Sequence, residues 1–228
     1  MPRDDENRSH QQEHSPYLVT VSDSTRKDAR HQSPSVARNT QPILETLAGR
    51  LPETGLVLEL ASGTGEHAMA LGRTFPKLTF QPSDPTSDAR ASISAWRATL
   101  KLPNVLPPLN LDATHPDWEA SINFPVSAML VCNLLHISPW AATQGLLRGA
   151  GRLLSPNSKL FIYGCFSKAG KHLSTSNEQF HESLIRRNPA WGVRSVEEVE
   201  KEGNQHGLEI SDIIPMPANN LMLSFSRP

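Results

Sequence analysis

A glycine-containing turn directly behind a short apolar run constrains the fold of this chain more than any other feature. Residues 56–60 are apolar except for Glu59, and Ala61-Ser62-Gly63-Thr64-Gly65 follow them. Such a run is typical of a buried parallel strand. The two glycines allow a tight turn into a helix and a close approach of the backbone to a ligand. The pattern therefore predicts a strand, a binding loop and a helix of an α/β protein.

Strand-like and helix-like segments alternate along the chain. This alternation predicts a mostly parallel sheet with helices on both faces. The expected strands are residues 56–60, 78–81, 105–111, 126–132, 159–163, 208–214 and 221–225, and the expected helices are residues 35–49, 66–75, 86–100, 139–154 and 196–206. Pro42 predicts a kink or a restart in the first helix, and Pro107 and Pro108 break the third strand. A polar insertion, residues 167–191, receives no element.

The last two expected strands are joined by residues 215–220, a link too short for a helical crossover. They should therefore form an antiparallel hairpin. A seven-stranded, mostly parallel sheet closed by one reversed hairpin is the layout of the Rossmann-like class I S-adenosylmethionine (SAM) methyltransferase fold, and we expect that fold here.

Three acidic residues lie at or near the carboxyl ends of the expected strands. Glu59 is placed to organise the glycine loop and to meet a cationic amino group of a ligand. Asp84 can accept both hydroxyls of a ribose, or it is a turn residue before Pro85. Asp112 can accept a hydrogen bond from an adenine amino group, or it caps the segment that follows.

The glycine pattern by itself also fits the dinucleotide fingerprint Gly-x-Gly-x-x-Ala. A dinucleotide site has little use for an acid beside its pyrophosphate, so Glu59 favours SAM, with S-adenosylhomocysteine (SAH) as the product. The residues of these motifs that we expect to contact the cofactor are Glu59, Ala61, Gly63, Gly65, His67, Asp84, Asp112, Ala113 and Asn133.

The loop after the fourth expected strand carries the candidate for chemistry. Asn133 and His136 follow the most apolar strand, and ligands of open α/β folds bind at the carboxyl ends of strands. The ordinary pKa of histidine suits a general base at neutral pH, although His136 can equally serve only as a hydrogen-bonding residue. Methyl transfer asks little of side chains, because the sulfonium is already activated and placement of the nucleophile does most of the work.

Nine blocks of the chain resemble the DUF938 (UPF0585) family of methyltransferase-like proteins, which includes the animal methyltransferase-like 26 proteins. The matching blocks are Ala37-Arg38-Asn39, Pro42-Ile43-Leu44, residues 58–67, Gln81-Pro82-Ser83-Asp84, Leu134-Leu135-His136-Ile137-Ser138, Tyr163-Gly164, Ser176-Asn177, Asn188-Pro189-Ala190-Trp191-Gly192 and Met216-Pro217-Ala218-Asn219-Asn220. The match runs from about residue 33 to the end and implies the SAM fold and SAM binding, without defining a substrate.

The resemblance also suggests pocket residues. Arg38 and Asn39 join the expected cofactor contacts, and Tyr163 joins His136 as a candidate catalytic residue. The candidate substrate-binding residues are Trp140, Phe166, Asn177, Phe180, Asn219 and Asn220. The aromatic members either line a pocket for an aromatic or lipophilic acceptor or belong to the core. The two consecutive asparagines either need buried partners or belong to a turn.

Several positions depart from the family pattern. Ala37 stands where the family often has Glu, Cys165 replaces a usual Pro, and His181 and Ser195 occupy positions that are often Asp. Loss of acids near the substrate side suggests a changed acceptor or a changed reaction.

Composition narrows the partners and the compartment. The formal net charge of -1 argues against nucleic acid, and the chain has neither an apolar run of membrane-spanning length nor a secretory signal. Two cysteines without histidines at metal-ligand spacing predict no metal. We expect a cytoplasmic protein with a polar, largely disordered tail, residues 1–33, and a methyltransferase domain, residues 34–228.

These observations favour a SAM-dependent methyltransferase acting on a small molecule. One alternative is a SAM-binding protein that catalyses an isomerisation or cyclisation, or that serves as a non-catalytic subunit. A second is a nicotinamide-dependent oxidoreductase, and a third is a methyltransferase acting on protein or RNA. Both a monomer and a homodimer remain open.

Overall fold

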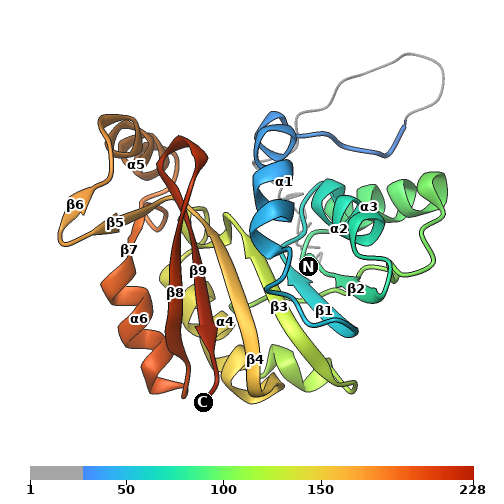
Figure 1. The fold of residues 1–228 in the computed structure, drawn as a ribbon. Helices are drawn as coiled ribbons and strands as arrows, with labels where there is room; N and C mark the ends of the chain where they lie inside the picture. The colour runs from blue at the N-terminus through green and yellow to red at the C-terminus, as the bar shows by residue number, and fades with distance from the viewer. Residues whose placement is uncertain (1–27) are drawn as a thin grey trace, which may run out of the picture.

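Six strands form the central sheet of the computed structural model, which describes residues 28–228 (Figure 1). Their order across the sheet is β2 (Leu78–Pro82), β1 (Gly55–Leu60), β3 (Val126–Cys132), β4 (Leu154–Gly164), β9 (Asn220–Ser226) and β8 (Glu209–Met216). Strands β1 to β4 are parallel, whereas β9 runs antiparallel to both β4 and β8. The expected class I SAM-methyltransferase fold with its reversed C-terminal hairpin is confirmed. Residues 1–27 of the expected tail lie outside the described residues.

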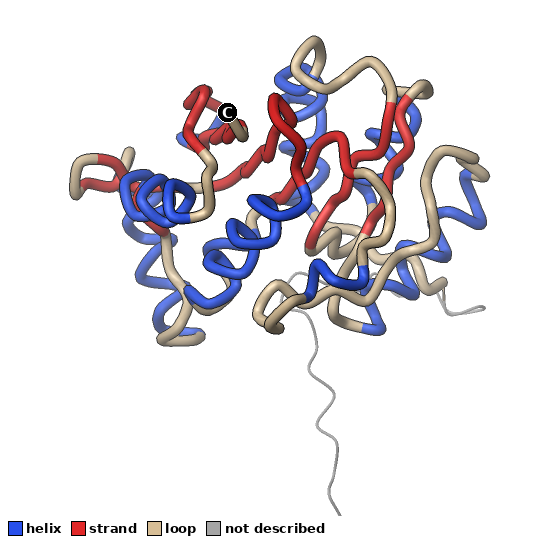
Figure 2. The backbone as a smooth tube through the Cα atoms, turned by 90° about the horizontal axis from the view of Figure 1, so that it is seen from below, coloured by secondary structure: helices blue, strands red, loops and turns tan. Residues whose placement is uncertain are grey.

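Successive residues of the strands face opposite sides of the sheet, which divides the core into two layers. Val57 packs with α1 (Pro34–Leu47), α2 (Glu66–Thr74) and α3 (Ser87–Leu100). Leu58 belongs to the layer that includes α4 (Trp140–Leu153) and α6 (Val196–Gln205). Figure 2 shows helices on both sides of the strands. None of the helices within residues 28–228 combines the length and apolar character that a membrane span requires.

The third expected strand, residues 105–111, does not form a ladder. It touches β2 only through two isolated parallel bridges, Phe80 with Val105 and Ser83 with Leu109. Pro107 and Pro108, between these bridges, have no N–H to donate to a neighbouring strand. The central sheet therefore has six strands rather than the expected seven, because two consecutive prolines prevent residues 105–111 from pairing as a strand.

The polar insertion is structured rather than irregular. It contains β5 (Phe166–Lys168), β6 (Lys171–His172) and α5 (Thr175–Arg187), and β5 pairs with both β6 and β7 (Arg194–Ser195) in a separate small sheet. Short 3-10 helices η1 (Trp118–Ser121), η2 (Leu134–His136) and η3 (Pro217–Asn219) complete the order of elements.

The N-terminal end of the domain differs from prediction in two ways. The N-cap position of helix α1 is Ser33 rather than Ser35, without a capping hydrogen bond from the Ser33 side chain, and the helix continues through Pro42 without a restart. The backbone N–H of His31 donates to Ser92 Oγ at 2.8 Å, and both His31 and Ser33 are buried. The predicted boundary between the tail and the domain, at residues 33 and 34, therefore falls within a segment that packs against the domain.

Candidate functional site

The glycine loop between β1 and α2 has the backbone that its sequence predicts. Gly63 and Gly65 have φ angles of +53° and +87°, a region that glycine enters at little cost. A Cβ on Gly65 would lie 2.8 Å from Ile93 Cγ1, whereas one on Gly63 would meet nothing within 4 Å. Gly65 is therefore required for packing against α3, and Gly63 leaves the backbone open toward the cavity.

Asp84 fastens this loop to the end of β2. Its Oδ2 accepts the N–H of Gly63 at 3.0 Å, and its Oδ1 accepts the N–H and the hydroxyl of Thr86, both at 2.9 Å. A carboxylate offers about four lone-pair positions, so one position on Oδ2 remains. In this arrangement Asp84 can accept one ribose hydroxyl, not the two that we expected, because Thr86 uses the other oxygen.

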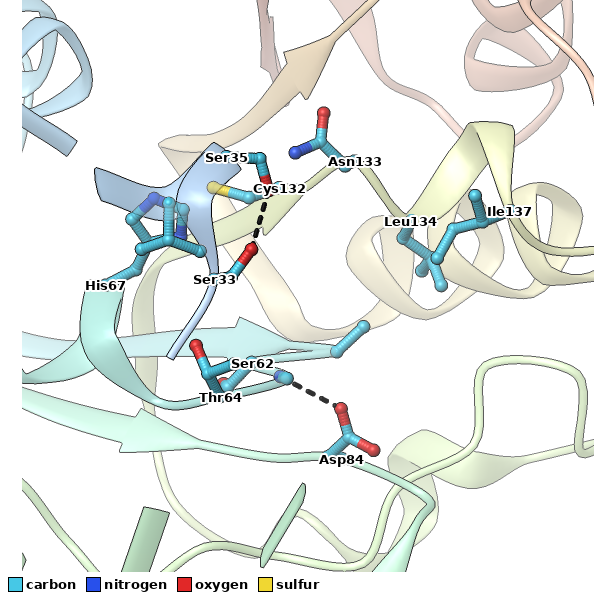
Figure 3. Close-up of a pocket in the computed structure, with 13 residues that line it drawn as sticks. Ser33, Ser35, Ser62, Thr64, His67, Asp84, Cys132, Asn133, Leu134 and Ile137 are labelled. Carbon is cyan, nitrogen blue, oxygen red and sulfur yellow. Dashed lines mark hydrogen bonds between the residues drawn. The ribbon is translucent and has the colours of Figure 1, made fainter. Parts of the chain in front are cut away.

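Two adjoining hollows open at the carboxyl ends of β1, β2 and β3, and they share Ala61, Asp84, Leu134 and Ile137. We call them the first and the second hollow; with their open mouths they hold about 570 and 1490 Å³. The first is lined by Ser33, Ser35, Val36, Ala61, Ser62, Gly63, Thr64, His67, Asp84, Cys132, Asn133, Leu134 and Ile137 (Figure 3).

The second hollow has a more apolar wall. Leu111, Ala113 and Ala142 line it together with Asp112 and Pro139. Asp112 accepts the N–H and the hydroxyl of Thr114 on Oδ1, which leaves Oδ2 for a ligand group. The fold thus brings most of the predicted cofactor residues to one continuous cavity.

Glu59 lies beneath the loop rather than in the cavity wall. It is only 1% exposed, and burial raises the pKa of its carboxyl group to about 7, helped by the charge of Asp84. His67 is buried beside the first hollow, where its Nε2 lies 2.9 Å from Asn39 Oδ1, and burial lowers its pKa to about 4. Arg38 is exposed on α1.

His136 is not arranged as the expected general base. Its Nε2 accepts the backbone N–H of Cys165 at 2.8 Å, so a neutral ring carries its proton on Nδ1. Burial, helped by the charge of Arg194, lowers the pKa of His136 to about 3. Gly164 makes this fit possible, since a Cβ there would lie 2.1 Å from Nε2. Tyr163, the other catalytic candidate, is also buried, and burial raises the pKa of its phenol.

The expected substrate residues do not gather around the cavity. Phe166 is fully buried in the core, and Asn177 is used to donate to the backbone oxygen of Asn219 at 2.9 Å. Asn219 is exposed, and Asn220 donates to Pro217 O within the turn, so of the two alternatives for this pair the turn is the one that forms.

The two remaining aromatic candidates are also placed away from the described hollows. Phe180, on α5, is 38% exposed. Its ring packs edge-to-face against the His136 ring, with 6.3 Å between the two ring centroids. The guanidinium carbon of Arg194 lies over the ring of Trp140, 5.8 Å from the centroid of that ring.

Sequence reasoning missed the loop of residues 188–192, which closes the far side of the second hollow. Asn188 and Trp191 line that hollow. Arg194 holds the loop by donating to the backbone oxygens of Leu135, Ser138 and Ala190 at 2.8 to 3.1 Å. The block Asn188-Pro189-Ala190-Trp191-Gly192 marked the place in the sequence without indicating its role.

Comparison with solved structures defines the fold class. The mitomycin 7-O-methyltransferase MmcR superimposes with a TM-score of 0.72 at 14% identity, covering 86% of this chain and 55% of that one. CalO1, a methyltransferase of calicheamicin biosynthesis solved with SAH bound, gives 0.68 at 13% identity over 85% and 54%. An O-methyltransferase family 2 protein from Planctomyces limnophilus, solved with apigenin, gives 0.66 at 17% over 84% and 61%. The chain spans little more than half of each.

Sequence comparison then gives the family. Residues 30–227 match the family described as "Protein of unknown function (DUF938)", and this chain belongs to that family. An O-methyltransferase of Armillaria gallica is 29% identical over 119 residues, which is 50% of this chain and 24% of the relative. The chain therefore spans about a quarter of that curated relative.

Proposed function

We propose that this protein is a SAM-dependent methyltransferase that acts on a small molecule. The observation that carries the proposal is the continuous cavity at the glycine loop, with Asp84 at the junction of its two hollows. One remaining lone pair on Asp84 Oδ2 suits a ribose hydroxyl. The apolar wall at Leu111 and Ala113 suits an adenine ring, with Asp112 Oδ2 for its amino group.

The residues around the first hollow suit the methionine half of the cofactor. Glu59 keeps one buried carboxylate oxygen without a hydrogen-bond partner among residues 28–228, and a ligand ammonium would satisfy it, directly or through water. When bound, SAM supplies an activated methyl group. The chain's own contribution is to bind, orient and shield it from water, which accounts for much of the rate of such a transfer.

The acceptor belongs to the same proposal. The named relatives are O-methyltransferases, so phenolic hydroxyls and carboxylates are the first acceptors to test. A bulky acceptor that contacts Phe166 or Asn177 needs helix α5 or the loop of residues 188–192 to shift, since both side chains are buried.

Methyl transfer can be tested with SAM that carries a tritiated methyl group. Wild type should transfer tritium to at least one member of a panel of phenols, catechols and carboxylic acids, with SAH formed in equal amount. Asp84→Asn should lower kcat/KM at least about tenfold, a loss of about 1.4 kcal/mol of transition-state binding. Asp212→Asn, a change of the same kind on the remote strand β8, should leave it unchanged.

A second candidate function follows from His136. Because its Nε2 is engaged and its pKa is held near 3, the site offers no histidine base at this position. Tight SAM binding with no tritium in any product would favour a SAM-binding protein that catalyses a non-methylating reaction or serves as a subunit.

A further inference from the structure

Three side chains with metal-ligating atoms converge beneath the first hollow. Glu59 comes from β1, His67 from α2 and Cys132 from the end of β3, and their ligating atoms all lie within 4.8 Å of one another. No local sequence pattern indicates this cluster, because its members are far apart along the chain and only the fold brings them together.

The cluster has an unmet polar group. Glu59 Oε2 is buried and has no hydrogen-bond partner among residues 28–228. A buried carboxylate oxygen without a partner is costly and is rare in folded proteins. It points to a ligand that the protein atoms do not supply.

The histidine is already oriented as metal-binding histidines are. Asn39 Oδ1 lies 2.9 Å from His67 Nε2, and an amide oxygen can only accept, so Nε2 carries the proton. The lone pair of the imidazole is therefore on Nδ1. A carbonyl partner that fixes the tautomer of the ligating ring is the usual outer contact of a metal site.

The cluster is also accessible. His67 and Cys132 both line the first hollow, and the sulfur of Cys132 points toward the His67 ring (Figure 3). An ion entering by that hollow would meet sulfur, nitrogen and oxygen together. Mg²⁺ and Ca²⁺ prefer all-oxygen sites, whereas a mixed set of thiolate, imidazole and carboxylate suits Zn²⁺ and related transition metals.

We propose that Glu59, His67 and Cys132 bind one Zn²⁺-class transition-metal ion, with its fourth coordination position facing the first hollow. Three protein ligands and one open position is an arrangement that Zn²⁺ adopts in proteins. Binding requires loss of the thiol proton of Cys132 and of the carboxyl proton of Glu59 where that group is protonated, and both protons go to the solvent or buffer.

One consequence rests on the proposed function. The ion would use Glu59 and occupy space that the methionine half of SAM needs, and its charge would repel the ammonium and sulfonium groups. Metal and SAM should therefore compete for the site.

The test uses Co²⁺ as a coloured substitute for Zn²⁺ on the full chain, after reduction and removal of metals by a chelator. Wild type should bind one Co²⁺ per chain with a thiolate-to-cobalt band in the near ultraviolet, and Zn²⁺ should abolish the band. Cys132→Ser should lose it, and Cys165→Ser, the matched change at the other cysteine, should keep it. Asn39→Ala should weaken binding about 10- to 100-fold, as expected for an outer contact.

Absence of the band in folded wild type, or a band that survives Cys132→Ser, would overturn the metal site. Circular dichroism of each variant separates loss of binding from loss of fold. Saturation with SAH should weaken Co²⁺ binding at least about tenfold, the ratio that 1.4 kcal/mol represents. Unchanged Co²⁺ binding with SAH bound would refute the competition alone, and failure of SAH to bind would count against the proposed function and not against the metal site.

Discussion

Individual residues of the glycine loop carry different constraints. Gly65 combines a left-handed backbone with contact to Ile93, whereas Gly63 has the backbone angle alone. Identical substitutions at the two positions therefore separate packing from backbone strain.

We predict that Gly65→Ala lowers the free energy of unfolding by about 2 to 5 kcal/mol, since a left-handed φ costs about 1 to 2 kcal/mol and an overpacked contact about 1 to 3 kcal/mol. Gly63→Ala, with open space around its new methyl group, should cost only about 1 to 2 kcal/mol. Urea unfolding of both variants measures the difference, and equal losses would contradict the contact with Ile93.

His136 predicts a specific dependence of stability on pH. Its pKa is about 3 when folded, against the ordinary histidine pKa of 6.5, so between these values the unfolded chain binds a proton that the folded chain does not. Stability contributed by the neutral ring is thus complete above pH 6.5 and falls as the pH drops.

Comparison with His136→Gln isolates this effect, because glutamine keeps an oxygen that can accept the N–H of Cys165. Between pH 7 and pH 5 wild type should lose about 2 kcal/mol more than the variant, on the basis of 1.36 kcal/mol per pKa unit. Buried His67 contributes equally to both proteins. Parallel urea-unfolding curves for the two proteins across this range would show that His136 is solvated.

At the scale of elements, the loop of residues 188–192 depends on one side chain from β7. Arg194 reaches three backbone oxygens of two different loops, and the N–H of Gly192 adds a bond to His136 O at 2.9 Å. We infer that this loop, which forms part of the wall of the second hollow, can open locally while the central sheet stays folded.

Arg194→Met should accordingly weaken SAH binding about tenfold or more, because the loop loses the hydrogen bond from Arg194 to Ala190 O, and a hydrogen bond to a charged donor contributes about 1.5 to 3 kcal/mol. Amide hydrogen exchange of residues 188–192 should accelerate, while that of the central strands should not change. Arg186→Met, on the exposed side of α5, is the control. Unchanged exchange in the loop would refute its dependence on Arg194.

The elements that could be predicted from sequence are those with strong local signals. The strands β1 and β3 are runs that are apolar apart from Glu59 and Ser127, and the C-terminal hairpin follows from the short link between its strands. The third expected strand failed because two prolines remove its donors, and the insertion failed because α5 is a polar helix with only Asn177 and Leu184 buried.

The site was predictable only where its residues adjoin the glycine loop or the strand ends. Asp84 and Asn133 follow from that topology, since parallel strands end at one edge. The engagement of His136 with Cys165, and the meeting of Glu59, His67 and Cys132, depend on side-chain contacts between distant elements, which no local pattern reports.

For the whole molecule, the central claim is that the two hollows together form one SAM site. Calorimetric titration of the full chain with SAH tests it most directly. We expect SAH to bind at one site per chain. Asp84→Asn should weaken this binding at least about tenfold, and Asp212→Asn should retain it. A folded wild-type chain that binds neither SAH nor SAM would contradict the account, and binding of NADH in their place would assign the glycine loop to a dinucleotide.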